Sequence, residues 1–316
     1  MEQLSSVVHR TPLTTSATLN EQTGKNVFMK MENQQKTGAF KIRGASYKIS
    51  QLTKHEMKRG VIAASAGNHA QGVALAAAKR GIEAKIFMPA NTPKAKTKAT
   101  EGYGAKIVLT GESFQEAYEA AIEEQKRSKA VFIHPFDDPD VMAGQGTIAI
   151  EMLEDQPSLD TLIVPVGGGG LISGIAFAAK SINPAIQVIG VQAEGASATY
   201  NQFHSKGATS LPSVSTIADG IAVKRPGEKT YPIIRNYVDK MITVSDQQIA
   251  ATMVQMLERE KTMVEGAGAT ALAALLSYHK KINSQNCGIV VSGGNMDIAK
   301  LPAIQSLSQQ NKYKVV

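Results

Sequence analysis

The sequence lacks the features that mark secreted and membrane-spanning proteins. Its single cysteine, Cys287, has no partner for a disulfide within the chain, and its place in an apolar run favours a small core residue. Residues 1–10 contain no apolar core of a signal peptide, and no apolar run is long enough to span a bilayer. These absences predict a cytoplasmic protein with no membrane contact.

Charge of one sign is not concentrated in the chain. There are 34 lysines and arginines against 27 aspartates and glutamates, a net charge of +7, and the local cluster is Lys94, Lys96 and Lys98. No aromatic residues alternate with these lysines, so a solvated surface is favoured over a nucleic-acid site. Internal repeats, low-complexity tracts and long linkers are also missing. With 316 residues, of which 43% are hydrophobic, the chain predicts one large or two medium globular domains.

Short apolar runs alternate with helical patterns along most of the chain, which is typical of an α/β fold. The spacing predicts strands at residues 27–31, 60–65, 84–89, 105–109, 130–133, 161–166, 187–191, 241–244 and 287–291. Capping boxes at residues 113–116 and 245–248 predict helix starts, and a further helix is expected over residues 141–155. We expect two interleaved parallel α/β domains with a cleft between them. Residues 1–54 and 138–316 form the larger, and residues 55–137 form the smaller, substrate-binding one.

Ligands in such folds bind beyond the carboxyl ends of strands, where polar loops occur at residues 65–69, 167–170 and 292–295. The second loop consists of Gly167, Gly168, Gly169 and Gly170, followed by a helix that opens with Leu171. Free N–H groups and the positive end of the helix dipole would suit a phosphate there. The spacing matches neither the Walker pattern nor G-x-G-x-x-G. A turn that only lets strand and helix pack closely explains the glycines equally well.

A lysine among apolar neighbours is the second candidate. Lys41 lies between Phe40 and Ile42, and Arg43 is a second cation nearby. Such surroundings can lower the pKa of an amine and make it a nucleophile that forms a Schiff base. A lysine at a helix start, with its stem on an apolar surface, is the simpler interpretation, and the local pattern alone favours it.

Four segments taken together are more specific than any one of them. They read Thr37-Gly-Ala-Phe-Lys-Ile-Arg-Gly-Ala45, Ser65-Ala-Gly-Asn-His-Ala-Gln71, Gly167-Gly-Gly-Gly-Leu171 and Ser292-Gly-Gly-Asn295. In this order and spacing they resemble the pyridoxal-phosphate enzymes of the tryptophan-synthase-β fold (fold type II), in particular the branch of threonine/serine dehydratases and serine racemases. Similar segments at residues 143–147, 218–220 and 265–268 extend the likeness over nearly the whole chain. Within this branch the chain is most similar to the short threonine dehydratases of the catabolic type.

The resemblance implies a role for each loop. Lys41 matches the lysine that carries pyridoxal phosphate as a Schiff base and removes the α-proton of the substrate. Residues 167–170, with Leu171, match the loop that binds the cofactor phosphate. Asn68 matches the amide that contacts the ring hydroxyl, and Phe40 a side chain that packs on the ring. The substrate carboxylate is implied to bind at Ser65 and at the backbone of Ala66, Gly67, Asn68 and His69. Without the resemblance, these loop residues would be interpreted as a strand-to-helix turn, and Phe40 as a core side chain.

Ser292 matches the residue that faces the pyridine nitrogen of the cofactor. A hydroxyl can donate a hydrogen bond there but does not keep the nitrogen protonated, which suits β-elimination better than transamination. The implied reaction is that of a threonine ammonia-lyase, which converts L-threonine into 2-oxobutanoate and ammonia. L-Serine would give pyruvate by the same route, because a methyl group is worth only about 1–3 kcal/mol in discrimination. The alternatives are a serine or 3-hydroxyaspartate dehydratase, a serine racemase, and a non-catalytic protein that binds a phosphate ligand.

Some positions depart from the pattern of the family. Ala39 stands where many relatives carry a serine, and the change removes a hydroxyl near the cofactor. Gln192 and Ala198 stand where serine racemases carry acidic ligands of a divalent metal. Glu194 is nearby, but one carboxylate is a poor site for a hard cation, so we expect no metal and little effect of chelators.

Two further departures bear on the products and on regulation. Ala66 stands where serine racemases carry a serine that donates a proton on the face of Cα opposite the lysine, so little D-serine is expected. The chain ends at Val316 without the C-terminal domain that senses isoleucine in the biosynthetic dehydratases, so isoleucine should not inhibit. A homodimer or homotetramer is the assembly we expect, and no motif decides whether AMP activates.

Overall fold

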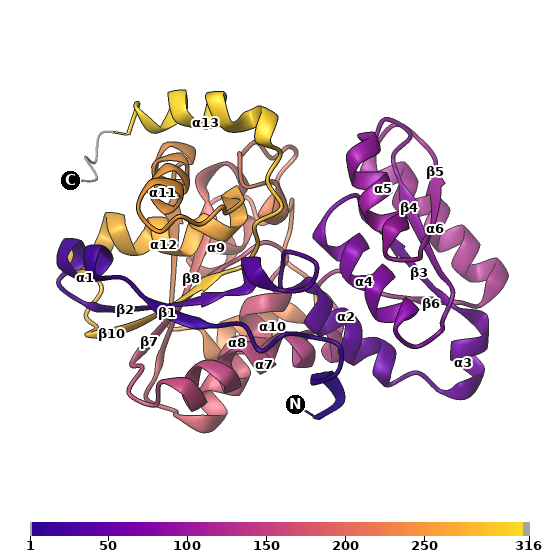
Figure 1. The fold of residues 1–316 in the computed structure, drawn as a ribbon, viewed down its shortest axis with the longest axis horizontal. Coiled ribbons are helices and arrows are strands. Elements are labelled where there is room, and N and C mark those ends of the chain that lie inside the picture. Colours follow the sequence, from indigo (N-terminus) through magenta and orange to yellow (C-terminus); the bar gives the residue numbers. More distant parts are fainter. Residues whose placement is uncertain (1, 312–316) are drawn as a thin grey trace.

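Continuous apolar runs form the strands of two sheets, which lie side by side in this computed structural model of residues 2–311 (Figure 1). The six-stranded sheet has the order β1 (Leu13–Thr15), β2 (Asn26–Met31), β10 (Asn286–Val291), β7 (Thr161–Pro165), β8 (Gln187–Ala193) and β9 (Lys240–Val244). The four-stranded sheet has the order β5 (Lys106–Leu109), β4 (Ala84–Met88), β3 (Val61–Ala64) and β6 (Val131–Phe132). Every strand expected from the sequence is present, with bounds that differ by at most two residues.

Strand β1 is the strand that the sequence did not predict. It pairs with β2 in the antiparallel sense, with Leu13 opposite Lys30, while the other neighbours in this sheet are parallel. Three residues are too few for a periodic pattern, and an edge strand forms because its partner offers a free row of hydrogen bonds. The larger sheet is therefore parallel apart from this edge.

Helices cover both faces of the six-stranded sheet, as Figure 1 shows. In β7, Leu162 and Val164 face the core under α7 and α8, and Ile163 faces the core under α11 and α12. A strand that is buried on both faces must be apolar throughout, which is why its run is continuous. The helices are α1 (Ala17–Thr23), α2 (Lys41–Ser50), α3 (Lys54–Arg59), α4 (Asn68–Ala78), α5 (Lys94–Gly102), α6 (Phe114–Ser128), α7 (Pro139–Asp155), α8 (Gly170–Ile182), α9 (Ala198–Phe203), α10 (Thr230–Tyr237), α11 (Asp246–Glu258), α12 (Gly266–Tyr278) and α13 (Leu301–Ser308).

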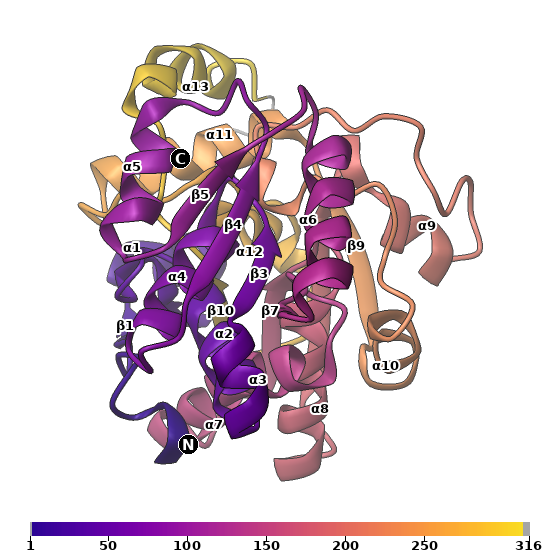
Figure 2. The ribbon, with the colours of Figure 1, turned by 90° about the vertical axis from the view of Figure 1, so that its right-hand side faces the viewer.

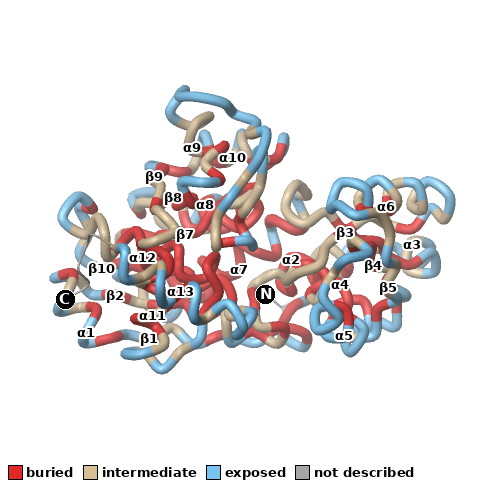
Figure 3. The backbone as a smooth tube through the Cα atoms, turned by 90° about the horizontal axis from the view of Figure 1, so that it is seen from above, coloured by how far each residue is buried: buried red, intermediate tan, exposed pale blue. Residues whose placement is uncertain are grey.

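Helix α2 lies between the two sheets. Its residues Ala45 and Ile49 pack with α4 on one face of the four-stranded sheet, and α6 covers the other face (Figure 2). On its other side α2 contacts α7, which belongs to the layers of the larger sheet. Figure 3 shows buried residues along both sheets and in α2 between them. The domain boundaries near residues 54 and 137 stay a prediction.

Two helix starts differ from their predicted form. Ser113 caps α6 by accepting from the Glu116 N–H, but the Glu116 carboxylate accepts from the N–H of Glu112 at 2.7 Å instead of closing a capping box. The box at residues 245–248 is complete. Helix α7 begins at Pro139, two residues earlier than expected, because Asp138 caps it. Across residues 2–311, none of the helices combines the length and the apolar character that crossing a bilayer requires.

Candidate active site

The loop before Lys41 is joined to the loop after β10 by backbone hydrogen bonds. The Phe40 N–H donates to Ser292 O at 3.1 Å, and the Gly294 N–H donates to Gly38 O at 2.9 Å. Ala39 and Gly293 form an isolated antiparallel bridge between them. Two of the predicted segments, which are about 250 residues apart in sequence, therefore meet at the carboxyl end of β10. Ser292, the last residue before the turn, is buried.

Lys41 is the first residue of α2 and is partly buried. Its Nζ donates to Pro135 O at 2.8 Å and lies 5.2 Å from the centre of the Phe40 ring. Burial lowers the pKa of the Lys41 amine to about 8, against the attraction of Glu265, which raises it. At neutral pH a useful fraction of the amine is thus unprotonated and can act as a base or nucleophile.

Arg43 does not have the role that the sequence suggested for it. Its guanidinium is fully buried and donates to both Glu32 and Glu151, at 2.7–2.9 Å. Its charge is therefore matched by two carboxylates, and the pKa of Lys41 is lowered by burial instead of by this cation. The sequence interpretation was wrong on this cause, because nothing local shows that two acids from elsewhere meet Arg43.

The glycine loop joins β7 to α8 with its N–H groups free at the helix start. Gly169 has φ +98°, a conformation that favours glycine, and the Ser173 N–H donates to Gly169 O at 2.9 Å as the first bond of the helix. The N–H groups of Gly170, Leu171 and Ile172 precede that bond and are the unpaired donors of a helix start. On the opposite side, Gly168 O accepts from Thr230 Oγ1 at 2.7 Å. The loop thus has its carbonyl tied to protein and its donors available for an anion.

Close packing is a second reason for the glycines. A Cβ on Gly168 would lie 2.5 Å from the Phe136 ring, and a Cβ on Gly170 would lie 2.8 Å from the Phe136 backbone. Both interpretations of the loop therefore hold: the glycines let Phe136 approach, and the helix start offers donors. Because Phe136 follows Pro135, the same segment contacts Lys41 and the glycine loop and brings these two parts of the site together.

Helix α4 begins at the end of β3 in the same way. Gly67 precedes the helix without a capping side chain, and the Gln71 N–H donates to Gly67 O at 3.4 Å as the first bond. The N–H groups of Asn68, His69 and Ala70 precede it and face no partner within the helix. Ser65 Oγ accepts from the Gly67 N–H at 3.2 Å, which shapes the turn. The loop offers a second site for an anion, as expected for a substrate carboxylate.

The imidazole of His69 is held away from that anion site. It is buried, and its Nε2 lies 2.8 Å from Ile133 O, so this nitrogen must carry the hydrogen. Burial, helped by the charge of Lys41, lowers the pKa of His69 to about 3. The ring is neutral at physiological pH, so the His69 side chain adds no positive charge to the anion site.

The sequence missed several residues that support the site. Glu265 accepts from Asn68 Nδ2 at 2.8 Å, and burial together with the repulsion of Asp219 raises the pKa of Glu265 to about 8. This carboxylate had appeared in the resemblance but without a role. No local signal in the sequence indicates that Pro135 accepts from Lys41, that Phe136 packs on the glycine loop or that Thr230 donates to Gly168 O. Gln192, in contrast, is buried with both ends of its amide bound, to Val166 O at 3.2 Å and to the Tyr200 N–H at 2.7 Å.

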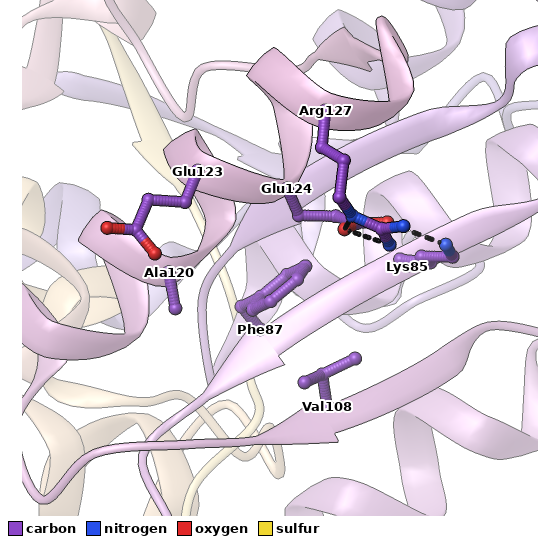
Figure 4. Close-up of a pocket in the computed structure, with 7 residues that line it drawn as sticks. All are labelled: Lys85, Phe87, Val108, Ala120, Glu123, Glu124 and Arg127. Atoms are coloured by element: carbon purple, nitrogen blue, oxygen red, sulfur yellow. Dashed lines mark hydrogen bonds and ion pairs between the residues drawn. The ribbon is translucent and has the colours of Figure 1, made fainter.

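A depression elsewhere on the surface has no part in this arrangement. It lies on the face of the four-stranded sheet that α6 covers, opposite α4 (Figure 4). Its lining residues are Lys85, Phe87, Val108, Ala120, Glu123, Glu124 and Arg127. None of them is a predicted site residue, and both of its cations, Lys85 and Arg127, pair with Glu124.

Comparisons with known proteins identify the family of the chain. The family described as pyridoxal-phosphate dependent enzymes matches residues 4–293. The chain belongs to this family. The L-threonine ammonia-lyase of Thermotoga maritima is 50% identical over 301 residues, which are 95% of this chain and 75% of that protein.

Two solved structures extend the comparison. The processed form of threonine deaminase isoform 2 from Solanum lycopersicum has a TM-score of 0.94 and 37% identity, over 98% of this chain and 85% of that one. Maize serine racemase has a TM-score of 0.90 and 41% identity, over 98% and 94%. The fold is that of the fold type II pyridoxal-phosphate enzymes, as expected, and it is common to lyases and racemases.

The residues present fit pyridoxal phosphate, the cofactor of the family. An amine with a lowered pKa, a helix start with free donors for the phosphate, and a buried hydroxyl at Ser292 are the groups that such a cofactor requires. The individual assignments, including Phe40, Asn68 and residues 167–171, stay predictions.

Proposed function

We propose that the protein is an L-threonine ammonia-lyase that converts L-threonine into 2-oxobutanoate and ammonia, and L-serine into pyruvate and ammonia. The observation that carries the proposal is how the Lys41 amine is linked to two uncapped helix starts, those of α4 and α8. Its charge acts on His69 in the first turn of α4, and it donates to Pro135, whose neighbour Phe136 packs on the start of α8. One suits the carboxylate of an amino acid and the other suits a phosphate. The identity to the Thermotoga maritima lyase supports threonine as the substrate.

Pyridoxal phosphate, when bound, supplies an electron sink for the electrons of the α-carbon. Lys41 is the residue that holds it covalently and then removes the α-proton, since its amine has a pKa near the working pH. The backbone N–H groups of residues 68–70 and Ser65 hold the carboxylate of the amino acid. Such contacts would fix the orientation of the amino acid relative to the Lys41 amine, which would take the α-proton.

Ser292 would offer a neutral hydroxyl to the ring nitrogen of the cofactor. The hydroxyl can accept or donate a hydrogen bond but adds no charge, so the ring withdraws electrons less strongly than with a carboxylate partner. Loss of the β-hydroxyl soon after the α-proton is then favoured over reactions that need a long-lived carbanion. This supports elimination as the main outcome.

The likeness to maize serine racemase keeps racemisation as the second candidate. Purified protein should be loaded with pyridoxal phosphate and given L-threonine, L-serine and 3-hydroxyaspartate in turn, with keto acids and D-serine both quantified. We expect the highest kcat/KM for L-threonine, lower values for the others and little D-serine. If D-serine forms as fast as pyruvate, the protein is a racemase instead of a lyase. If the protein does not bind the cofactor, it is a non-catalytic protein that binds another phosphate ligand.

Assembly and location belong to the same proposal. We infer a homodimer or homotetramer in the cytoplasm, in line with the expectations from the sequence. Light scattering on the loaded protein measures the assembly directly, and a monomer at micromolar concentration would contradict it.

A further inference from the structure

The side-chain amides of Asn295 and Asn68 form a chain of hydrogen bonds that crosses the site from the Thr37 carbonyl to the Glu265 carboxylate. Asn295 Nδ2 donates to Thr37 O at 2.8 Å and to Asn68 Oδ1 at 2.8 Å. Asn68 Nδ2 in turn donates to Glu265 Oε1 at 2.8 Å. Asn68 opens α4, on the side of the four-stranded sheet that faces the larger sheet (Figure 1), while Asn295 and Glu265 follow β10 and precede α12. The hydrogen bonds therefore join the two halves of the site.

The chemistry of this chain fixes which way each amide points. Thr37 O can only accept, so the atom of Asn295 that faces it must be the nitrogen. Both N–H groups of Asn295 are then used, one on Thr37 O and one on Asn68, and the atom of Asn68 that receives the second must be its oxygen. Asn68 therefore turns its nitrogen to Glu265 and retains one further N–H for another partner.

Two glycines leave room for the side chains of Asn295 and Glu265. Gly38 has φ +70°, and a Cβ there would lie 2.4 Å from Asn295 Oδ1. A Cβ on Gly293 would lie 2.4 Å from Glu265 Oε1. Any larger residue at either position would displace the amide or the carboxylate. The packing around these two glycines thus agrees with a fixed, single orientation of the amide chain.

We propose that Asn295 and Glu265 are positioning residues, which hold the Asn68 amide so that an N–H, and not its oxygen, faces the ring oxygen of the cofactor. The inference rests on the proposed function, because it concerns the group that the enzyme binds. An N–H donor stabilises a ring oxygen, whereas the amide oxygen would repel it. The arrangement needs Glu265 as an acceptor but not as an ion.

The charge of Glu265 is consistent with that requirement. The groups that face it are Asp219 from the 3-10 turn before α10, Lys96 from α5, Lys41 from α2 and the Asn68 amide. Burial and Asp219 raise its pKa to about 8, against the lysines and the hydrogen bond. A neutral carboxyl group still accepts through Oε1, so the orientation of Asn68 persists over the working range of pH.

The change Asn295→Asp tests the proposal directly. A carboxylate at this position cannot donate to Thr37 O or to Asn68, so the Asn68 amide must reverse to place its nitrogen there, and its oxygen turns to the Glu265 side. We expect the dissociation constant of pyridoxal phosphate, titrated into cofactor-free protein, to rise about tenfold or more, as loss of a hydrogen bond to a charged group implies. The visible absorption band of the loaded protein should shift as well.

Asn201→Asp is the matched control. Asn201 in α9 is half-buried and donates to a backbone carbonyl, Ala208 O, at 2.8 Å, so the substitution removes the same kind of bond and adds the same charge. It should leave the band and the dissociation constant unchanged. If Asn295→Asp lowers the melting temperature but changes neither cofactor readout, Asn295 merely joins the two halves of the protein and the proposal fails.

A pair of changes at Glu265 covers the case in which Asn295→Asp does not fold. Glu265→Gln keeps an acceptor of similar shape, and Glu265→Leu removes it. We expect Glu265→Gln to keep a dissociation constant nearer the parent, with Glu265→Leu about tenfold weaker. Equal values for the two would overturn the proposal. If the parent protein itself binds no cofactor, the proposed function fails first, so the two failures are distinguishable.

Discussion

Two cations in the first turn of helix α2, Lys41 and Arg43, have surroundings that are opposite in kind. Two residues along a helix correspond to a rotation of about 200°, so the two side chains leave α2 on opposite sides. Arg43 donates to two buried carboxylates, Glu32 and Glu151, whereas Lys41 donates to the uncharged carbonyl of Pro135. The pKa of Arg43 is accordingly raised, and that of Lys41 is lowered to about 8.

The carboxylate that pairs with Arg43, Glu151, and the carboxylate that attracts Lys41, Glu265, differ in the same way. Burial favours the neutral form of Glu151, but hydrogen bonds from Arg43 and Lys30 outweigh it and hold the pKa of Glu151 below its usual value. Burial of Glu265, with Asp219 nearby, raises its pKa to about 8. A matched charge fixes structure, and an unmatched one stays ready to exchange a proton. The comparison predicts different consequences for changes on each side.

Lys41→Ala on the unmatched side should have the largest effect. It removes the base and the covalent anchor together, so turnover should fall by at least about 10³-fold and the visible band of the bound cofactor should disappear. The melting temperature of the cofactor-free protein should stay equal or rise, because a buried amine without a charged partner is lost. Keto-acid production and colour that survive in this variant would refute the role of Lys41.

Arg43→Met on the matched side should act on folding. It removes the ion pair of Glu32 and leaves Glu151 with Lys30, and removing one partner of a buried ion pair costs about 3–5 kcal/mol. Denaturant unfolding measures the loss. Arg10→Met is the control, because Arg10 pairs with Glu154 and Asp155 at 46% exposure and should cost less than about 1 kcal/mol. Equal losses in the two variants would mean that burial of the pair is unimportant.

The raised pKa of Glu265 predicts a pH dependence of stability. Between its ordinary pKa of 4.5 and its folded value of about 8, the folded state binds a proton that the unfolded state lacks. This contribution is complete below pH 4.5 and is lost as the pH rises through 8. Relative to Glu265→Gln, the cofactor-free parent should therefore lose on the order of 1–3 kcal/mol between pH 5 and 8. Melting curves of the two proteins that stay parallel over this range would contradict the assignment.

The sequence could predict the fold because its evidence is local. The continuous run at residues 161–166 and the glycines after it indicate strand, loop and helix without reference to anything distant, and both elements are found. The three-residue strand β1 carries too little pattern and was missed. The polar loops were placed at the carboxyl ends of their strands by a rule of topology, so the expected location of the site followed from the strands alone.

The partners of the site residues could not be predicted, because they come from distant parts of the chain. Pro135 lies 94 residues from Lys41, and Glu265 lies 197 residues from Asn68. Arg43 is a position where an argument from neighbouring residues fails, because proximity in sequence suggested that Arg43 lowers the pKa of Lys41. In the structure its charge is matched by Glu32 and Glu151 on the far side of the helix.

The smallest expected effect concerns Ala66, in the loop that opens α4. Lys41 can return a proton to Cα only on its own side, so racemisation needs a donor on the opposite face, and the methyl of Ala66 cannot supply one. Ala66 is partly buried against the core beneath the loop, where a serine hydroxyl adds one atom.

Ala66→Ser should raise the ratio of D-serine to pyruvate formed from L-serine by about tenfold, with little change in pyruvate formation. This is less than the roughly 10²–10⁴-fold that an optimally placed acid contributes. Chiral chromatography of the products gives the ratio. An unchanged ratio would show that the hydroxyl does not reach Cα. A parent that already makes the two products equally would be a racemase whose donor on the opposite face is a group other than residue 66.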